Sequence, residues 1–179
     1  LGFVHRDAGE IEHAGGPPPP NPRDYESDAV LARAVFAAGE HRLRLTAQWN
    51  RERVRTDVDA LELSGGRFAN TVLLEGDDRA ENAGLLLDQD FSGVAGLDFA
   101  VWRAYWNETD ILQRTHEERR AVPAALPPLA FEREFSYDER VTGGELTLGR
   151  ELEVGAGTHR LLGGFELLEQ RVTQHRDGL

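Results

Sequence analysis

The sequence predicts an all-β protein, an antiparallel meander of about six long strands. Three observations support this prediction. Apolar and polar residues alternate one by one over long stretches, which is the period of a strand and not of a helix. Short turns rich in small residues, centred near Gly39, Val94 and Ala156, join these stretches in pairs. The pairs are separated by long connections, so short turns and long loops alternate along the chain.

The first third of the chain is predicted to hold one loop and two strands. Residues 5–28 are expected to form the loop, because Pro17 to Pro20 cannot donate the hydrogen bonds of a strand ladder. An apolar run at 29–36 turns through 37–41 into residues 42–57, which show the clearest alternation. One face of this strand carries Leu43, Leu45, Ala47 and Trp49, and the other carries Arg42, Arg44, Thr46, Gln48 and Asn50. The second face therefore requires water or a polar interior.

A central hairpin is predicted over residues 81–110, after a long loop at 58–80 that holds a short hairpin at 67–74. The sequence SGVAG supplies the turn of the central hairpin. On its outgoing strand, Leu85, Leu87 and Phe91 share one face, and Asp88 and Asp90 share the other. On its return strand, Ala100, Trp102, Ala104 and Trp106 lie opposite Phe99, Val101, Arg103, Tyr105 and Asn107. The hairpin thus repeats the pattern of one apolar and one mixed face.

A last hairpin is predicted over residues 132–173, after a second long connection at 113–131 whose prolines disfavour regular structure. Its apolar face carries Leu146, Leu148, Leu152, Leu161, Phe165 and Leu167. Its opposite face carries Glu145, Thr147, Glu151, Arg160, Glu166 and Gln170. Residues 1–4 are expected to be the end of a seventh strand.

Short turns at one end of the sheet and long loops at the other are typical of an outer-membrane β-barrel. The predicted strands of about 12–16 residues are long compared with the usual five or six of a soluble sheet. Trp49, Trp102 and Trp106 are expected on the outward face toward the long-loop end, as an interfacial aromatic girdle. A soluble sandwich or lipocalin-like barrel shows the same alternation with its apolar face turned inward, so alternation alone leaves both interpretations open.

Composition narrows the function classes. The 179 residues carry 32 acidic and 20 basic side chains, a net charge of −12, which disfavours a nucleic-acid partner. The absence of cysteine excludes disulfides and thiolate metal sites within these residues. We expect the chain to be a piece of a longer protein, since it opens within a strand pattern and carries no signal peptide.

Five stretches resemble, in order, the barrel of TonB-dependent outer-membrane receptors. They are NPRDYESDAVLARAVF (21–36), GEHRLRLTAQWNRERVRTD (39–57), VLLEGDDRAEN (72–82), RAYWNETDILQRTHEERR (103–120) and FSYDERVTGGELTL (135–148). They are most similar to the haem, haemoglobin, transferrin and lactoferrin receptor subfamily. The resemblance implies a transmembrane barrel of about 22 strands closed by a plug domain. Residues 1–179 are then a partial barrel that lacks the plug, the TonB box and the C-terminal strands.

The resemblance also implies a function. Such receptors bind haem or a haem-carrying protein at the bacterial outer membrane and admit haem or iron to the periplasm, energised by TonB through the plug. The expected partners are the haem source, TonB and outer-membrane lipid, and no enzymatic activity is expected. The alternatives are a siderophore or vitamin receptor of the same fold and a soluble β-sandwich binding module. An outer-membrane acyl-processing enzyme would need a paired Ser and His, which the sequence does not show.

No catalytic, cofactor-binding or metal-binding residue is assigned from the sequence. The FRAP and NPNL-like boxes of the family, with their loop histidine, have no matching positions here. His13 and His116 fall in predicted extracellular loops and are candidates for haem capture, because neutral imidazole binds haem iron; a solvated role is the simpler hypothesis. The acidic pairs at 77–78 and 117–118 are expected to be solvated. The residues expected to line the lumen and pair with one another and the plug are Arg42, Arg44, Asp88, Asp90, Arg103, Glu145, Glu151, Arg160 and Glu166.

Overall fold

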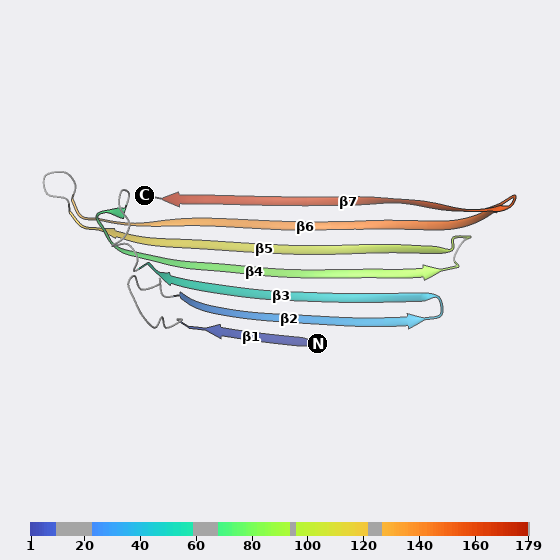
Figure 1. Ribbon diagram of the computed structural model, residues 1–179, viewed down its shortest axis with the longest axis horizontal. Helices are drawn as coiled ribbons and strands as arrows, with labels where there is room; N and C mark the ends of the chain where they lie inside the picture. Colours follow the sequence, from blue (N-terminus) through green and yellow to red (C-terminus); the bar gives the residue numbers. More distant parts are fainter. Residues whose placement is uncertain (10–22, 59–67, 94–95, 122–126, 179) are drawn as a thin grey trace.

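The computed structural model describes residues 1–9, 23–58, 68–93, 96–121 and 127–178 as one antiparallel sheet of seven strands. The strands are β1 (Gly2–Ala8), β2 (Arg23–Ala38), β3 (His41–Asp57), β4 (Thr71–Ser92), β5 (Phe99–Arg119), β6 (Leu129–Val154) and β7 (Gly157–Gly178). They lie side by side in chain order, as Figure 1 shows, and each pairs antiparallel with the next. The predicted all-β meander is confirmed, and β1 extends the expected tail of a seventh strand.

The short turns lie together at one end of the sheet. The turn between β2 and β3 contains Gly39, and the turn between β6 and β7 contains Gly155; both glycines have positive φ, 59° and 66°, which suits a residue without a Cβ. The prediction of a turn centred on Val94 lies outside the described residues, but β4 and β5 do join at that end. The long connections leave from the opposite end, so the predicted asymmetry is confirmed (Figure 1).

The strands are longer than the sequence predicted. β2 to β7 have 16, 17, 22, 21, 26 and 22 residues. The loops predicted over 5–28, 58–80 and 113–131 were therefore too long, because their flanking residues belong to strands. The short hairpin predicted at 67–74 is wrong: Thr71 to Leu74 pair with the end of β5, with a register irregularity between Thr71 and Leu73. These strand ends were missed because charge fills both faces there and hides the apolar alternation.

The sheet has two distinct faces, and the predicted division of side chains between them is confirmed by the register. Leu45 lies opposite Ala34 of β2 and Leu87 of β4, while its neighbour Arg44 lies opposite Asp88. We call the face that carries all three tryptophans, Trp49, Trp102 and Trp106, the tryptophan face. The other, which carries Arg44 and Asp88, is the mixed face.

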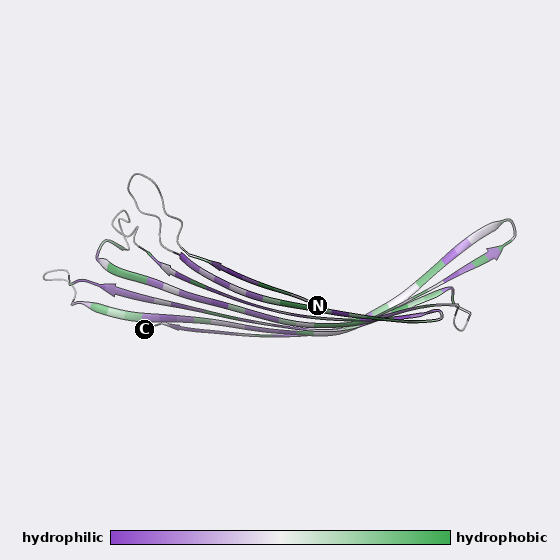
Figure 2. Ribbon diagram, turned by 90° about the horizontal axis from the view of Figure 1, so that it is seen from below, coloured by the Kyte–Doolittle hydropathy of each residue, from purple (hydrophilic) through white to green (hydrophobic). Residues whose placement is uncertain are grey.

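Neither face is covered by a second layer of the described residues. Figure 2 shows the sheet edge-on as a single layer that bends along its length, with the β6–β7 hairpin turned away from the rest. Ala100 is the only buried hydrophobic residue among those described, and Leu85, Phe165 and Leu167 are 46%, 60% and 70% exposed. The apolar side chains are thus not enclosed between two sheets. No helix in the described ranges has the length and apolar character needed to cross a membrane.

Aromatic rings lie flat over glycines on the mixed face. A Cβ added at Gly143 would collide with the ring of Tyr105, and one added at Gly149 would collide with Phe99. In each case the glycine lies directly opposite the aromatic residue, across β5 and β6. These glycines give large side chains of the mixed face room to lie along the sheet.

Candidate functional site

The tryptophan face is divided into two zones along the strands. Toward the short turns lies an apolar zone, which comprises Val30, Ala32, Ala34, Phe36, Leu43, Leu45, Ala47, Trp49, Ala83, Leu85, Leu87, Phe91, Ala100, Trp102, Ala104, Trp106, Leu146, Leu148, Phe165 and Leu167. Toward the long loops lies a charged zone, in which most side chains are acidic or basic; it includes Asp28, Arg51, Arg53, Arg55, Glu75, Asp77, Arg79, Glu81, Glu108, Asp110, Arg114, Glu134, Asp138, Arg140, Glu169 and Arg171. One face thus meets two different environments.

Tryptophans mark the border between the zones. Trp49 precedes Arg51 on its face of β3, and Trp106 precedes Glu108 on its face of β5. The indole nitrogen of Trp49 donates a hydrogen bond of 2.7 Å to Glu81 in the charged zone. An indole with its ring among apolar groups and its N–H toward polar groups is typical of an interface.

The structure corrects the expected position of the tryptophans along their strands. Trp102 lies near the short-turn end of β5, where its indole nitrogen donates a 3.0 Å hydrogen bond to Gln89. Trp49 and Trp106 lie within their strands at the zone border, with charged strand continuing beyond them. The reason is the same as for the loops: the strands run further than the sequence pattern indicated.

The apolar zone ends level on β2 to β4, where Val30, Trp49 and Ala83 lie opposite one another, and it ends nearer the short turns on β5 to β7. In register, Trp49 of β3 is level with Arg171 of β7, yet the apolar zone of β7 already ends at Leu167, four residues nearer the short turns. The turns are displaced the same way: Leu148 is level with His41, which begins β3, but β6 continues six residues further, to Val154. A displacement of roughly 13–20 Å across about 19 Å of sheet corresponds to a tilt of about 35–45° between the strands and the normal to the band.

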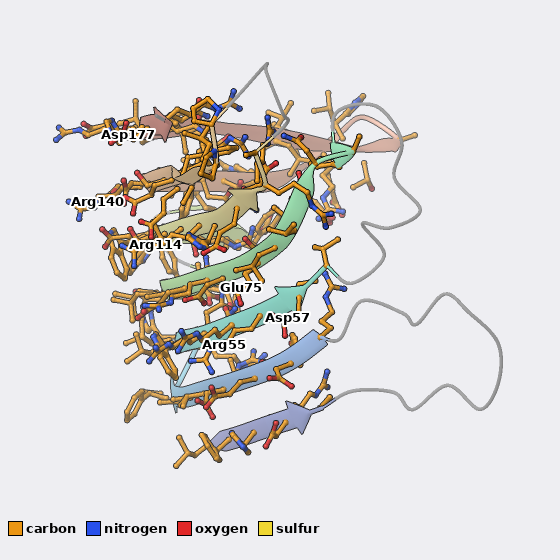
Figure 3. All side chains as sticks on the ribbon, turned by 90° about the vertical axis from the view of Figure 1, so that its left-hand side faces the viewer. Arg55, Asp57, Glu75, Arg114, Arg140 and Asp177 are labelled. Carbon is orange, nitrogen blue, oxygen red and sulfur yellow. The ribbon has the colours of Figure 1, made fainter. Side chains whose placement is uncertain are left out.

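Several side chains of the charged zone form ion pairs with side chains of opposite charge. Arg53 and Arg79 both hydrogen-bond Asp77, with Nη2 to Oδ2 distances of 2.8 Å. Arg114 Nε lies 2.8 Å from Glu134 Oε2. Figure 3 labels six charged residues of this zone, which come from five successive strands: Arg55, Asp57, Glu75, Arg114, Arg140 and Asp177.

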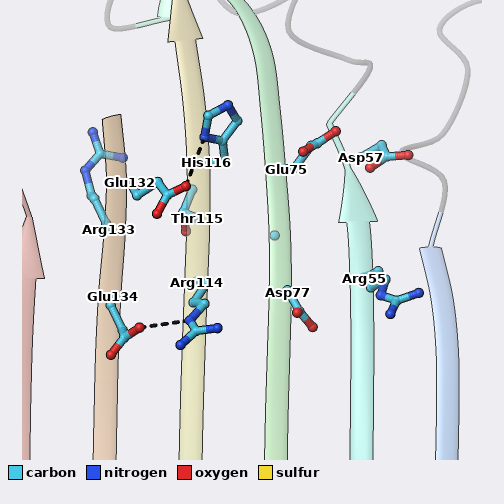
Figure 4. Close-up of a pocket in the computed structure, with 11 residues that line it drawn as sticks. Arg55, Asp57, Glu75, Asp77, Arg114, Thr115, His116, Glu132, Arg133 and Glu134 are labelled. Atoms are coloured by element: carbon cyan, nitrogen blue, oxygen red, sulfur yellow. Dashed lines mark hydrogen bonds and ion pairs between the residues drawn. The ribbon is translucent and has the colours of Figure 1, made fainter. Parts of the chain in front are cut away.

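A polar hollow of about 510 Å³ lies over β3 to β6 in this zone. Arg55, Glu75 and Arg114 are among its lining residues, and Figure 4 shows the Arg114–Glu134 and His116–Glu132 pairs beside it. Among the described residues, no group of three or more histidines and carboxylates is arranged to hold a metal ion. The hollow therefore has the character of a hydrated, charge-paired surface.

The charged zone shifts the pKa of two carboxyl groups in opposite directions. Hydrogen bonds from Arg53 and Arg79 hold the pKa of Asp77 far below its usual range. Asp110 lies directly opposite Asp138, and a hydrogen bond with that carboxyl, together with burial and its negative charge, raises the pKa of Asp110 to about 6. Both residues lie beyond the apolar zone.

The mixed face carries part of the expected charge pairing. Arg44 pairs with Asp88 and Asp90, and Arg103 lies 2.7 Å from Glu145. Arg160 and Glu166 do not form the expected ion pairs among the described residues. Arg160 instead places its guanidinium 5.4 Å from the ring of Phe99. Glu166 instead accepts a 2.9 Å hydrogen bond from Tyr105.

Glu117 is the clearest site that sequence reasoning missed. It was expected to be solvated in a loop, but it lies in β5 on the mixed face and is 0% exposed. Its carboxylate accepts hydrogen bonds from Thr71 at 2.8 Å, Arg119 at 2.7 Å and Arg133 at 3.1 Å. These bonds tie β4, β5 and β6 together at the long-loop end. The Glu-x-Arg spacing within β5 was its only signal in the sequence.

Of the two histidines proposed as candidates for haem capture, only His116 lies within the described residues. His116 is not in a loop: it lies in β5 on the tryptophan face, 3.3 Å from Glu118 and 3.8 Å from Glu132. His13 lies outside the described residues. Among the described residues, His116 belongs to no group of three or more side chains that could hold a metal ion.

Comparisons with known proteins do not identify the chain. No family model matches the sequence, and no curated protein matches it.

Proposed function

We propose that this chain forms part of the wall of an outer-membrane β-barrel receptor that takes up haem or iron from a haem-carrying protein, energised by TonB. In this proposal the apolar zone faces lipid and the mixed face lines a hydrated or plugged lumen. The short turns lie in the periplasm, and the long loops lie outside the cell. The chain then transports its ligand without breaking a bond.

The oblique apolar zone is the observation that carries the proposal. A membrane is a flat layer, so it cuts tilted strands at positions that differ between the two sides of the sheet. The tilt of about 35–45° derived from Leu167, Trp49 and the turns falls in the range of outer-membrane barrels. A sheet that buried one face against a second layer would need no such displacement.

Three further features support the membrane part of the proposal. The apolar zone is uncovered, with Leu85 46% exposed. Tryptophans stand at its border, and Trp49 directs its N–H to Glu81. The opposite face is polar at the same level, where Arg44 pairs with Asp88. A bilayer on one side and water or a plug on the other satisfies all three.

The uptake of haem or iron rests on the resemblance of the five barrel stretches. A siderophore or vitamin receptor of the same architecture would share every feature of the wall. Uptake measurements therefore test which ligand is transported. Contact with lipid tests whether the sheet forms the wall of a membrane barrel.

Neighbouring cysteine substitutions test the wall directly, because residues 1–179 contain no cysteine of their own. Leu45→Cys lies on the tryptophan face and Thr46→Cys on the mixed face of the same strand. In membranes of the full-length protein, a water-soluble maleimide is expected to label the cysteine at 46 and to spare the one at 45. Equal labelling, or labelling of 45 alone, would contradict the proposal.

A further inference from the structure

Two arginines lie directly opposite each other on the tryptophan face, where the apolar zone ends. Arg140 of β6 is paired in register with Arg171 of β7. Arg140 is the first ionisable residue beyond the apolar zone on this face of β6. Like charges that lie directly opposite one another on two strands repel each other. The arrangement therefore favours an anion between the two guanidinium groups.

The register places arginine opposite arginine at one other position in the part of the chain that the structure describes. Arg53 of β3 lies opposite Arg79 of β4, also on the tryptophan face. Both guanidinium groups donate a 2.8 Å hydrogen bond to the same atom, Oδ2 of Asp77. In this first pair, a shared carboxylate offsets the repulsion between the two arginines.

Arg140 and Arg171 share no carboxylate among the described residues. Arg140 Nη2 lies 2.6 Å from Glu108 on β5, and Arg171 Nη2 lies 2.6 Å from Glu169 on its own strand. The two arginine side chains are 54% and 75% exposed, and Arg140 points away from the sheet in Figure 3. Exposed ion pairs of this kind contribute little to stability, and each guanidinium has five N–H donors. Donors of both arginines are therefore available to a further anion.

The surroundings of the pair indicate what kind of anion fits. Trp106 and Leu167 are the last residues of the apolar zone on β5 and β7, and Glu108 and Glu169 follow them on this face. A molecule held by the arginines thus has apolar side chains on one side and charged side chains on the other. A phosphate headgroup that carries acyl chains has the same division, and a free anion lacks the apolar part.

We propose that Arg140 and Arg171 together bind the phosphate group of a membrane lipid from the leaflet on the long-loop side. The acyl chains of this lipid lie along the apolar zone beside Trp106 and Leu167. Its phosphate accepts charge-assisted hydrogen bonds from both guanidinium groups, as the shared carboxylate does in the other pair. This inference rests on the membrane part of the proposed function and adds a lipid that the barrel binds on its outer surface and does not transport.

Quenching of a fluorophore beside the pair tests the proposal. Bimane is attached to the Leu167→Cys variant of the full-length protein in phosphatidylcholine vesicles. Phosphatidic acid or phosphatidylcholine with bromine on its acyl chains is then added in equal amounts to separate samples. We expect a preference of about tenfold for phosphatidic acid, because its phosphate monoester carries more negative charge and no choline cation. Replacement of both arginines, Arg140→Gln with Arg171→Gln, should abolish this preference.

Arg114→Gln is the matched control. The Arg114 side chain is 53% exposed on the same face and lies 2.8 Å from Glu134, so its exposure and pairing resemble those of Arg140. It lies six residues beyond Glu108 along β5, away from the apolar zone. Its replacement is expected to leave the lipid preference unchanged. The proposal is overturned if the double variant keeps the preference, if Arg114→Gln also removes it, or if both lipids quench the native arginine pair equally.

Inorganic phosphate distinguishes a lipid from a free anion. At the concentration of the brominated lipid, it is expected to leave the preference for phosphatidic acid unchanged, because it gains nothing from the apolar zone. Loss of the preference would assign the two arginines to a free anion and overturn the proposed lipid.

The outcome is distinguishable from failure of the proposed function. The maleimide test at positions 45 and 46 reads only which face meets lipid. Normal labelling without a preference for phosphatidic acid would remove the lipid site and retain the wall. Reversed labelling would remove the wall and, with it, the lipid site.

Discussion

The indole N–H of Trp49 on β3 donates a 2.7 Å hydrogen bond to the carboxylate of Glu81 on β4, across the line where the apolar zone gives way to the charged zone. The indole of Trp49 thus connects the apolar zone with the charged zone. Glu81 lies level with Arg51, the first charged residue beyond Trp49 on that face of β3. A side-chain hydrogen bond therefore marks the border of the apolar zone. We expect substitutions on the two sides of this border to affect stability differently.

Arginine placed within the apolar zone is expected to destabilise the protein in a bilayer. Leu87→Arg lies in the middle of the zone and is expected to cost about 2–4 kcal/mol, as charged residues facing lipid near the midplane do. Leu86→Arg, one residue away on the mixed face, is expected to cost less than half as much, because its charge meets a polar interior. Urea unfolding in lipid vesicles measures both variants. Equal costs would show that the two faces meet the same medium.

Removal of the Glu117 charge is expected to loosen the long-loop end of β4 to β6. Glu117→Gln leaves Arg119 and Arg133 without their carboxylate and should lower the free energy of unfolding by about 1–3 kcal/mol. Hydrogen exchange should quicken for the ends of these strands before it quickens near the short turns. Glu118→Gln, next in sequence and on the exposed opposite face, is the control and is expected to change little. If the Glu117→Gln variant is as stable as the native protein, the hydrogen bonds of Glu117 do not hold β4, β5 and β6 together.

The Asp110–Asp138 pair is expected to give an unusual dependence of stability on pH. The pKa of Asp110 is about 6 in the folded protein, above its value of about 4 in an unfolded chain. The folded state therefore binds a proton that the unfolded state releases, and stability should fall as pH rises from about 4 to 6. Asp110→Asn removes the carboxyl group that titrates. The free energy of unfolding of this variant should therefore exceed that of the native protein at pH 7, and the two should be similar near pH 4.

Asp24→Asn controls for a general effect of removing negative charge. Asp24 lies opposite Arg55, so its carboxylate faces a cation and not a second carboxyl group. Its replacement should bring no gain at pH 7. If both variants gain equally, net charge and not the carboxyl pair controls stability.

The edges of the sheet are expected to drive association when residues 1–179 are expressed alone. β7 is exposed along its whole length, and its outer edge has no partner strand among the described residues. An unpaired edge of this length is a template for another chain. Analytical ultracentrifugation in buffer should show aggregates, and a detergent should reduce them. A monomeric product with a single cooperative melting transition would contradict this expectation and favour a soluble fold.

The order of strands and the faces of their central parts could be predicted from the sequence, while their outer ends could not. Alternation at 42–50 separates Leu45 from Arg44 without ambiguity, and the register confirms it. At 75–81 both faces are polar, so the stretch looks like a loop until Asp77 is seen bonded to Arg53 on the neighbouring strand. Pairing between strands is a property of register, which one sequence does not display.

The role of Glu117 could not be predicted from the sequence for a related reason. Its partners lie far apart in the chain, since Glu117 of β5 accepts hydrogen bonds from Thr71 of β4 and Arg133 of β6. Each residue alone has an ordinary interpretation, since charged loops usually face water. Only the folded sheet brings these residues together.

The length of β6 beyond the zone border has a consequence for how a ligand first arrives. From Arg140 to Leu129 the strand continues for 11 residues, roughly 36 Å of extended chain at about 3.3 Å per residue. With the apolar zone in a bilayer and the strands tilted, this stretch would rise about 25–30 Å above the acyl chains. The extracellular opening of the barrel would then lie above the lipid headgroups. A large carrier protein could dock on its rim without touching the lipid surface.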